Sequence, residues 1–418
     1  MKKLMLAAAL GIFAVTSQAQ SSVQLYGLVD AGVTRVTGVN GGRATQLVSG
    51  IMDGSRWGLK GNEELGGGYR AIFTLENRFE VDTGAMSNRA VSGSQVPDRL
   101  IKAALLLPNQ SAGAQALLQP VLTGVSGVLG STIGVNLGNN LFDRQAFVGL
   151  VTPVGAVLAG RQYTPGYEMS ATFDIMNTSS SLSAGQLASF PPTVDIRLSN
   201  ALAYRIQQGP ITASLMYSLA EGSASTGRFV GAMGQYKTDA FSFGVGHNTR
   251  NNELGNKSLT GTIVGASAAV GPGTVSAYYA LIKDDNPSGL SGIAGQVALL
   301  APGAAAFGPA IQNAYIAALK QDAKIFHIGY RYVSGANTIW VAYTSLDDKR
   351  PNNADAQSYG VAYSYAVSKR TDLNLVATQF KNDGLSQAAP GGAGYLGGVT
   401  TTAGTDSNSL AFGVRHRF

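Results

Sequence analysis

Apolar and polar residues alternate along most of the chain with a period of two. The segment 22–34 shows this first, with apolar residues on one face and polar residues on the other: Val23, Leu25, Val29 and Val33 against Gln24, Asp30 and Thr34. This period predicts a β-strand that is wet on one side only. The segment 409–418 repeats the alternation up to the final Phe418. Many intervening segments follow the same pattern, so we expect an all-β fold.

The predicted strands are joined alternately by short turns and by longer loops. Seven short turns are predicted, at 64–68, 152–155, 208–210, 238–240, 271–273, 334–337 and 368–371. Eight longer loops fall at about 37–50, 83–141, 162–197, 221–227, 251–257, 284–322, 348–355 and 382–406. Short turns at one end and long loops at the other are typical of an outer-membrane β-barrel, whose closure leaves no unpaired sheet edge. We therefore predict a transmembrane antiparallel β-barrel of 16 strands. A soluble sandwich or propeller is the alternative, but the sequence has no blade repeat.

The stretch 160–197 differs from the other connections. An insert of this length without regular structure would normally argue against the strands on either side of it. A barrel lumen wide enough to hold the insert removes that objection. The stretch carries Glu168, Asp174 and Asp195, and Arg197 lies at its end. We therefore expect it to fold into the lumen and to form an acidic side of a constriction.

Three arginines are predicted to point into the lumen from the barrel wall. Arg56 has the opposite parity to its apolar neighbours, and the same argument applies to Arg144 and Arg197. An arginine on the lipid face at mid-depth costs about 2–4 kcal/mol, which favours the inward orientation. Opposed charges across a pore create a transverse field that sets ion preference. Two alternatives remain: the arginines only solvate a wet interior, and each loop acid only holds the loop to the wall.

The first residues predict export. Lys2 and Lys3 precede an apolar run, 4–15, which is followed by the small residues Ser17 and Ala19. This is the pattern of a secretory signal peptide, so we expect 1–19 to be removed after Ala19. The run is too short for a transmembrane helix, which needs about 20 apolar residues. Residues 20–418 then form one barrel domain, since no linker interrupts the alternation.

Charge and composition exclude several classes of protein. The 30 Lys and Arg exceed the 24 Asp and Glu only slightly and are scattered, which does not indicate nucleic-acid binding. The chain has no Cys and therefore no disulfide framework or thiolate metal site. His327 is the one histidine of three that parity directs toward the lumen, and no Ser or Asp partner is recognisable from the sequence. We expect no enzymatic activity, no cofactor and no metal.

Two inserts within the long loops are unusually apolar. They span 97–137 and 288–320, and each contains short runs of Ala and Leu that could form helices. Surfaces this apolar are seldom left open to water. Packing on the rim of their own barrel and contact with a neighbouring subunit are both consistent with the sequence.

Several ordered motifs resemble one known family. They are GSRWGLKG at 54–61, EELGGG at 63–68, DRQAFVGL at 143–150, GRQY at 160–163 and RLSNALAY at 197–204, followed by the C-terminal Phe418. Together they resemble the trimeric general-diffusion porins of Gram-negative outer membranes, most of all the betaproteobacterial branch. The resemblance implies that the third loop narrows the pore. It also implies that Arg56, Arg144 and Arg197 are the wall arginines facing that loop.

The same resemblance implies a function and partners. We expect a water-filled outer-membrane channel for passive diffusion of small hydrophilic solutes and ions, with a modest preference for anions. We also expect a homotrimer in outer-membrane lipid, with a C-terminal strand ending at Phe418 that the outer-membrane assembly machinery reads. The alternatives are a substrate-selective channel and a surface-binding barrel whose apolar inserts contact a partner.

Overall fold

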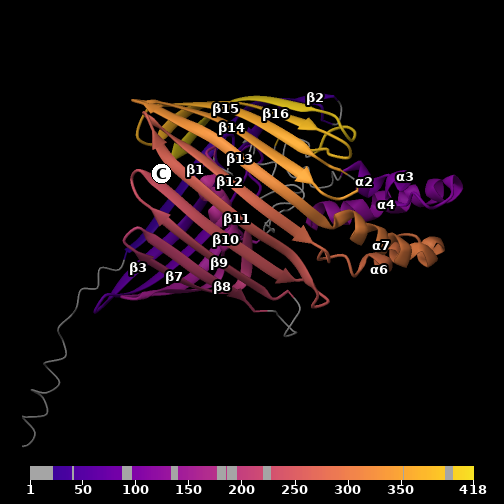
Figure 1. The fold of residues 1–418 in the computed structure, drawn as a ribbon, viewed down its shortest axis with the longest axis horizontal. Helices are drawn as coiled ribbons and strands as arrows, with labels where there is room; N and C mark the ends of the chain where they lie inside the picture. The colour runs from indigo at the N-terminus through magenta and orange to yellow at the C-terminus, as the bar shows by residue number, and fades with distance from the viewer. Residues whose placement is uncertain are drawn as a thin grey trace, which may run out of the picture.

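The computed structural model describes residues 22–39, 42–86, 97–132, 140–176, 185, 195–219, 227–351, 353–390 and 399–418, with the side chains of 127–132 excepted. The predicted signal peptide, 1–19, lies outside these residues. In the described part of the chain, one antiparallel sheet closes into a barrel (Figure 1). The first strand pairs with the last one, with Val33 opposite Phe412. This closure leaves no sheet edge that lipid would have to satisfy.

The described strands follow the predicted order. They are β1 Ser22–Thr37, β2 Arg43–Ser49, β3 Arg56–Gly66, β4 Tyr69–Arg78, β5 Gln145–Thr152, β6 Gly155–Tyr163, β7 Arg197–Gln208, β8 Ile211–Ser218, β9 Phe229–Lys237, β10 Phe241–Asn251, β11 Lys257–Val270, β12 Gly273–Asp284, β13 Gln321–Ser334, β14 Asn337–Asp348, β15 Ala356–Ala366, β16 Thr371–Asn382 and β17 Ser407–Arg417. All seven predicted short turns lie between consecutive strands at one end of the barrel, where Phe418 also lies (Figure 1).

The described strands occupy sixteen positions around the barrel, because β2 and β3 share one. The first half of β1, Ser22–Leu28, pairs with β3. The second half, Ala31–Thr37, pairs with β2. The predicted number of 16 strands is therefore confirmed. The predicted loop at 37–50 is wrong over β2, because Arg43–Ser49 forms a strand that pairs with Ala31–Thr37 of β1.

The break between β2 and β3 is organised by one buried carboxylate. Asp30 accepts hydrogen bonds from the backbone N–H groups of Ile51, Met52 and Asp53, each at 2.9 Å. The chain therefore turns toward the lumen at this point without leaving its amides unsatisfied. This turn places Asp53 beside Arg56, the first residue of β3.

The described part of the third long loop lies inside the barrel, as predicted. We call residues 164–196 the inner loop; its helix α5, Pro165–Phe173, packs against β9, β10, β11 and β12. Inward-facing glycines on these strands leave room for the helix. A Cβ at Gly265 would lie 2.2 Å from the ring of Phe173, so a larger residue there would displace α5.

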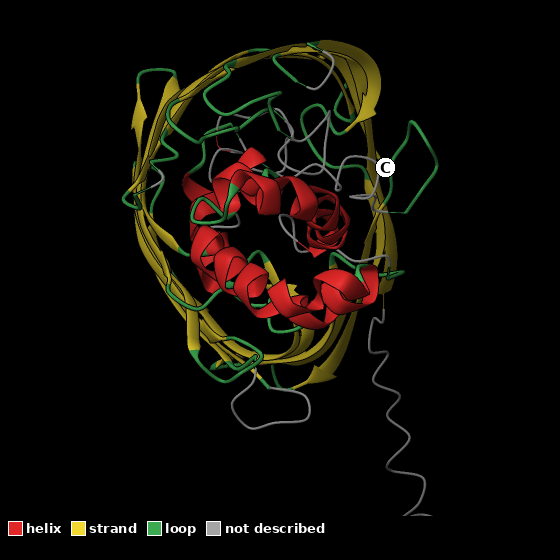
Figure 2. Ribbon diagram, turned by 90° about the vertical axis from the view of Figure 1, so that its right-hand side faces the viewer, coloured by secondary structure: helices red, strands yellow, loops and turns green. Residues whose placement is uncertain are grey.

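The two apolar inserts form helices that stand over the long-loop end of the barrel. The first contains α2 Asp98–Ile101, α3 Ala103–Leu106 and α4 Ala112–Thr132; the second contains α6 Ile293–Leu300, the 3-10 helix η2 Pro302–Phe307 and α7 Gly308–Leu319. Viewed along the barrel, these helices lie within the outline of its strands (Figure 2). None of the described helices is long and apolar enough to cross a membrane. We call the two inserts together the cap.

The two halves of the cap bury their apolar faces against each other. One cluster contains Leu118, Leu122 and Val125 from the first insert with Val297, Ile311 and Tyr315 from the second. The apolar inserts thus cover one another, which neither explanation considered from the sequence anticipated. Arg350, which follows β14, fastens the second insert by donating to the carbonyl of Ala318 at the end of α7 at 3.1 Å.

Candidate functional site

The base of the inner loop is fixed to the barrel wall by a small set of hydrogen bonds. Thr164 caps α5 by accepting from the backbone N–H of Tyr167, and Pro165 follows in the first turn, where its missing N–H costs nothing. Asn248 on β10 donates to Thr164 Oγ1 at 3.0 Å and accepts from the N–H of Gly166 at 2.9 Å. These contacts fix the angle at which the loop enters the lumen.

Each of the three predicted loop acids contacts a basic side chain on the wall. Their ion pairs are Glu168 with Arg205 at 2.8 Å, Asp195 with Arg250 at 2.8 Å, and Asp174 with His327 at 3.3 Å. Burial raises the pKa of all three carboxyls, and the basic partner of each offsets part of that rise. These partners come from β7, β10 and β13, and the pairings were not predicted from the sequence.

Two of the predicted wall arginines lie behind the surface of the lumen. Arg144 is 5% exposed and donates to Glu76 at 2.7 Å and to the hydroxyl of Tyr163 at 2.8 Å. Arg197 is also buried; it donates to the same hydroxyl at 3.0 Å and stacks over the Tyr163 ring at 4.5 Å. Tyr163 therefore holds both guanidinium groups next to the start of the inner loop.

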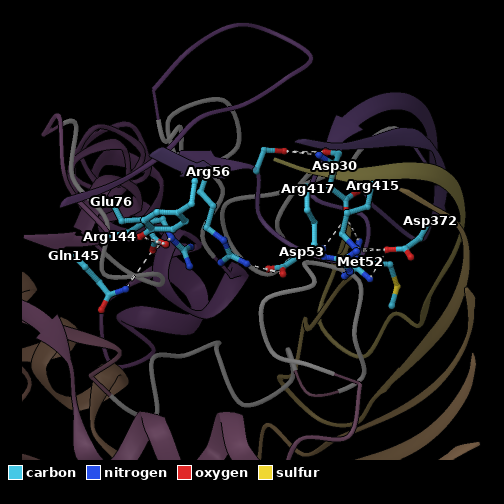
Figure 3. Close-up of polar contacts among 12 residues, drawn as sticks. Asp30, Met52, Asp53, Arg56, Glu76, Arg144, Gln145, Asp372, Arg415 and Arg417 are labelled. Atoms are coloured by element: carbon cyan, nitrogen blue, oxygen red, sulfur yellow. Dashed lines mark hydrogen bonds and ion pairs between the residues drawn. The ribbon is translucent and has the colours of Figure 1, made fainter. Parts of the chain in front are cut away.

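The third predicted arginine is more accessible. The side chain of Arg56 is 17% exposed and pairs with Asp53 at 2.6 Å. Figure 3 shows Arg56 between the Glu76–Arg144 pair and a second group on β16 and β17. In that group, Asp372 pairs with Arg415 at 3.0 Å and with Arg417 at 2.8 Å.

Further basic residues face the lumen near the short-turn ends of the strands. Their parity matches that of neighbours known to point inward, and all are partly or fully exposed: Lys60, Arg70, Arg205, Lys237, Arg331 and Arg417. Among the described residues, the acids paired with this set are Glu64, Glu168 and Asp372. The lumen is therefore more basic at this end. Parity along each predicted strand was the sequence signal that could have identified the set.

His327 has the acidic partner that the sequence did not reveal. Its Nε2 lies 3.3 Å from Asp174, and its Nδ1 lies 2.8 Å from the Thr344 hydroxyl. The side chains of His327 and Asp174 are fully buried, so no solute reaches them. The pair holds the end of α5 against β13. No described group of three or more His, Asp and Glu side chains could hold a metal ion.

Comparison with known proteins gives a consistent result. The family model described as Gram-negative porin matches residues 6–385. An outer membrane porin protein of Bordetella pertussis is 25% identical over an alignment of 447 positions that covers the whole of both chains.

Two solved structures share the fold. The anion-selective porin from Comamonas acidovorans has a TM-score of 0.66 at 22% identity, covering 95% of this chain and 100% of that one. The trimer form of OmpT from Vibrio cholerae has a TM-score of 0.57 at 12% identity, covering 95% of this chain and 99% of that one. At these identities the likeness shows the architecture alone.

Proposed function

The chain belongs to the Gram-negative porin family, and from this premise we propose that it passes small hydrophilic solutes and ions by passive diffusion, with a modest preference for anions. Family membership makes the protein an outer-membrane channel rather than an enzyme. The motif-based resemblance is confirmed, and the Bordetella pertussis relative belongs to the betaproteobacterial branch.

The excess of basic side chains facing the lumen carries the proposed preference. Lys60 and Arg70 are exposed near the short-turn end, which is the periplasmic end of this family's barrels. Charges in a narrow aqueous lumen are screened less than charges on an open surface, so they bias the entry of ions. The Comamonas acidovorans structure with the same fold is described as anion-selective. The pairing of each loop acid with a basic residue is why we propose a modest preference.

We further propose that the predicted charged residues form the constriction. Arg56 borders the open lumen, and Arg144 and Arg197 add positive potential from behind Tyr163. On the loop side, Glu168 borders the constriction, and Asp174 and Asp195 add negative potential from buried positions behind its surface. The geometry that supports this arrangement is the contact between Tyr163, at the start of the inner loop, and both buried arginines.

Selectivity tests the proposed function directly. Replacing Lys60, Arg70 and Arg417 together by Gln should move the zero-current potential under a KCl gradient toward cation preference. The shift should shrink as the salt concentration rises, because the Debye length falls from about 10 Å at 0.1 M to about 3 Å at 1 M. Lys324→Gln is the matched control, since Lys324 is exposed on the outward face of β13. Ohmic single-channel steps with an unchanged potential in the triple variant would contradict the assignment of selectivity to these residues.

We propose that the functional unit is a homotrimer in outer-membrane lipid. The support is family membership and the trimer form of OmpT among proteins with this fold. After extraction in mild detergent, light scattering should give the mass of three protein chains once the mass of the bound detergent is subtracted. Heating should then convert this species to one with the mass of a single chain. A single-chain mass after gentle extraction would refute the proposal.

We also propose that the assembly machinery reads the last strand. Phe418 closes the barrel: its N–H donates to the carbonyl of Gly27 at 3.0 Å, and its carbonyl accepts from the N–H of Gly27 at 3.1 Å. A C-terminal segment that completes the sheet only on closure is available for recognition before that step.

A further inference from the structure

A cavity of about 340 Å³ lies between the inner loop and the barrel wall. Its walls come from α5 and from the inward faces of β6, β7 and β9, and include Tyr163, Tyr167, Glu168, Met169, Arg205 and Met233. Small-molecule sites in proteins start at about 300 Å³ and combine apolar walls with a few polar groups that fix orientation. The cavity has this composition.

One charged pair supplies both signs within the cavity. Glu168 Oε1 lies 2.8 Å from a guanidinium nitrogen of Arg205, whose side chain is 40% exposed. The second carboxylate oxygen, Oε2, makes no hydrogen bond to any described residue. Buried polar atoms usually have partners, so this oxygen has capacity for a donor. Arg205 in turn has guanidinium N–H groups left for an acceptor, because its ion pair with Glu168 uses one of its nitrogens.

The other side of the cavity is aromatic and apolar. Tyr163 and Tyr167 stack at 5.1 Å between ring centroids, and Arg197 covers Tyr163 at 4.5 Å. This three-member stack holds the aromatic wall in place. Met169 and Met233 complete the apolar lining, and methionine adapts to side chains of different shape.

We propose that this cavity binds small zwitterions of the α-amino-acid type that carry an apolar or aromatic side chain. The ammonium group of the solute donates to the carboxylate of Glu168, whose side chain is 21% exposed. The carboxylate of the solute accepts from Arg205, and the solute side chain packs on Tyr167 and the two methionines. Arg205 would attract a simple anion, but Glu168 would repel it. Glu168 would attract a simple cation, but Arg205 would repel it. A zwitterion complements both charges at once. The proposal rests on the channel function, because the solute reaches the cavity through the lumen.

Binding here must be weak to be compatible with transport, since a solute that stays bound stops conduction. We therefore use L-phenylalanine at millimolar concentration as the probe. Added to single channels in a planar bilayer, it should cause brief current blockades whose frequency rises with its concentration. Benzoate and phenethylamine, which each carry one of the two charges, should give at least tenfold fewer blockades at the same concentration.

Two variants locate the effect. Ala171→Leu fills the cavity without altering either charge, and Arg205→Gln removes the group that holds the carboxylate while keeping its length. Both should reduce the blockades at least tenfold while unblocked current steps remain. Ala232→Leu makes the same change in size on the outward face of β9, beside Met233, and should leave the blockades unchanged.

The outcomes separate this inference from the proposed channel function. Equal blockade by benzoate would identify a simple anion site, and blockades that persist in Ala171→Leu would place the probe elsewhere. Either result overturns the zwitterion site while the current steps still support a channel. Absence of any current steps from the unmodified protein would instead refute the channel function.

Discussion

Replacing Arg144 by Met is expected to lower the free energy of unfolding by about 3–5 kcal/mol, since it leaves a buried carboxylate without its cation. Arg144 and Glu76 are 5% and 6% exposed, and their charged atoms lie 2.7 Å apart. Glu76 also accepts from the hydroxyl of Tyr26 at 3.1 Å, but a neutral hydroxyl compensates a buried charge only in part. Equilibrium unfolding by urea in detergent micelles measures the loss.

Two further variants identify the cause of that loss. Glu76→Gln combined with Arg144→Met removes both charges and should regain part of the stability, which a double-mutant cycle quantifies. Arg70→Met is the matched control on neighbouring β4. Arg70 and Glu64 are both about half exposed and lie 3.8 Å apart, and exposed pairs contribute only about 0–1 kcal/mol. If Arg144→Met and Arg70→Met lower the free energy of unfolding equally, the buried pair stabilises the fold no more than the exposed pair does.

The burial of Arg144 also changes how selectivity should be tested. Substituting Arg144 alters the fold around Tyr163 as well as the charge of the lumen, so a change in ion preference would have two causes. Lys60, Arg70 and Arg417 are more exposed and hence better suited. Arg56 is intermediate, because its removal leaves Asp53 beside the turn that Asp30 organises.

Local sequence pattern was sufficient to predict most of the barrel. The period of two determines which side chains share a face, and turn residues such as Gly271, with a φ of +56°, mark where the chain reverses. The strand β2 was missed because its continuation into β3 is interrupted at 50–55. That interruption depends on Asp30, which lies in a different strand.

The charged residues of the lumen were predictable as a set, but their contacts were not. Parity shows that Arg144 faces inward without showing that it meets Glu76, which is 68 residues away in sequence. The contact of Asp174 with His327 likewise depends on how deeply the inner loop enters the lumen. Strand register and loop path decide these pairs, and neither is encoded in a short window of sequence.

The contact between the two apolar inserts was also not predictable from local sequence. Their composition predicted helices that need an apolar partner. The two inserts are more than 150 residues apart along the chain, so the sequence did not suggest that each is the partner of the other. Either partner considered from the sequence would have satisfied that need. The barrel brings the second and sixth long loops over the same opening, and this arrangement makes each insert the partner of the other.

Replacing Leu122 by Asp is expected to separate the two halves of the cap while leaving the barrel intact. Leu122 is fully buried in α4, within the cluster that contains Val297 and Tyr315. Losing a buried leucine costs about 2–5 kcal/mol, and burying an unpaired carboxylate adds to that cost. The strands keep their own backbone hydrogen bonds, so the loss should stay local.

Hydrogen exchange of the reconstituted protein tests this expectation. Amides of α4 and α7 should lose protection in Leu122→Asp, whereas amides of β12 and β13 should keep it. Leu117→Asp is the control: it makes the same change on the same helix, at a side chain that is 79% exposed. It should leave protection of α7 unchanged, because Leu117 is already in water. Equal protection of α7 in both variants would mean that the halves of the cap do not depend on their shared core, and loss of protection in β12 would mean that the cap and barrel unfold together.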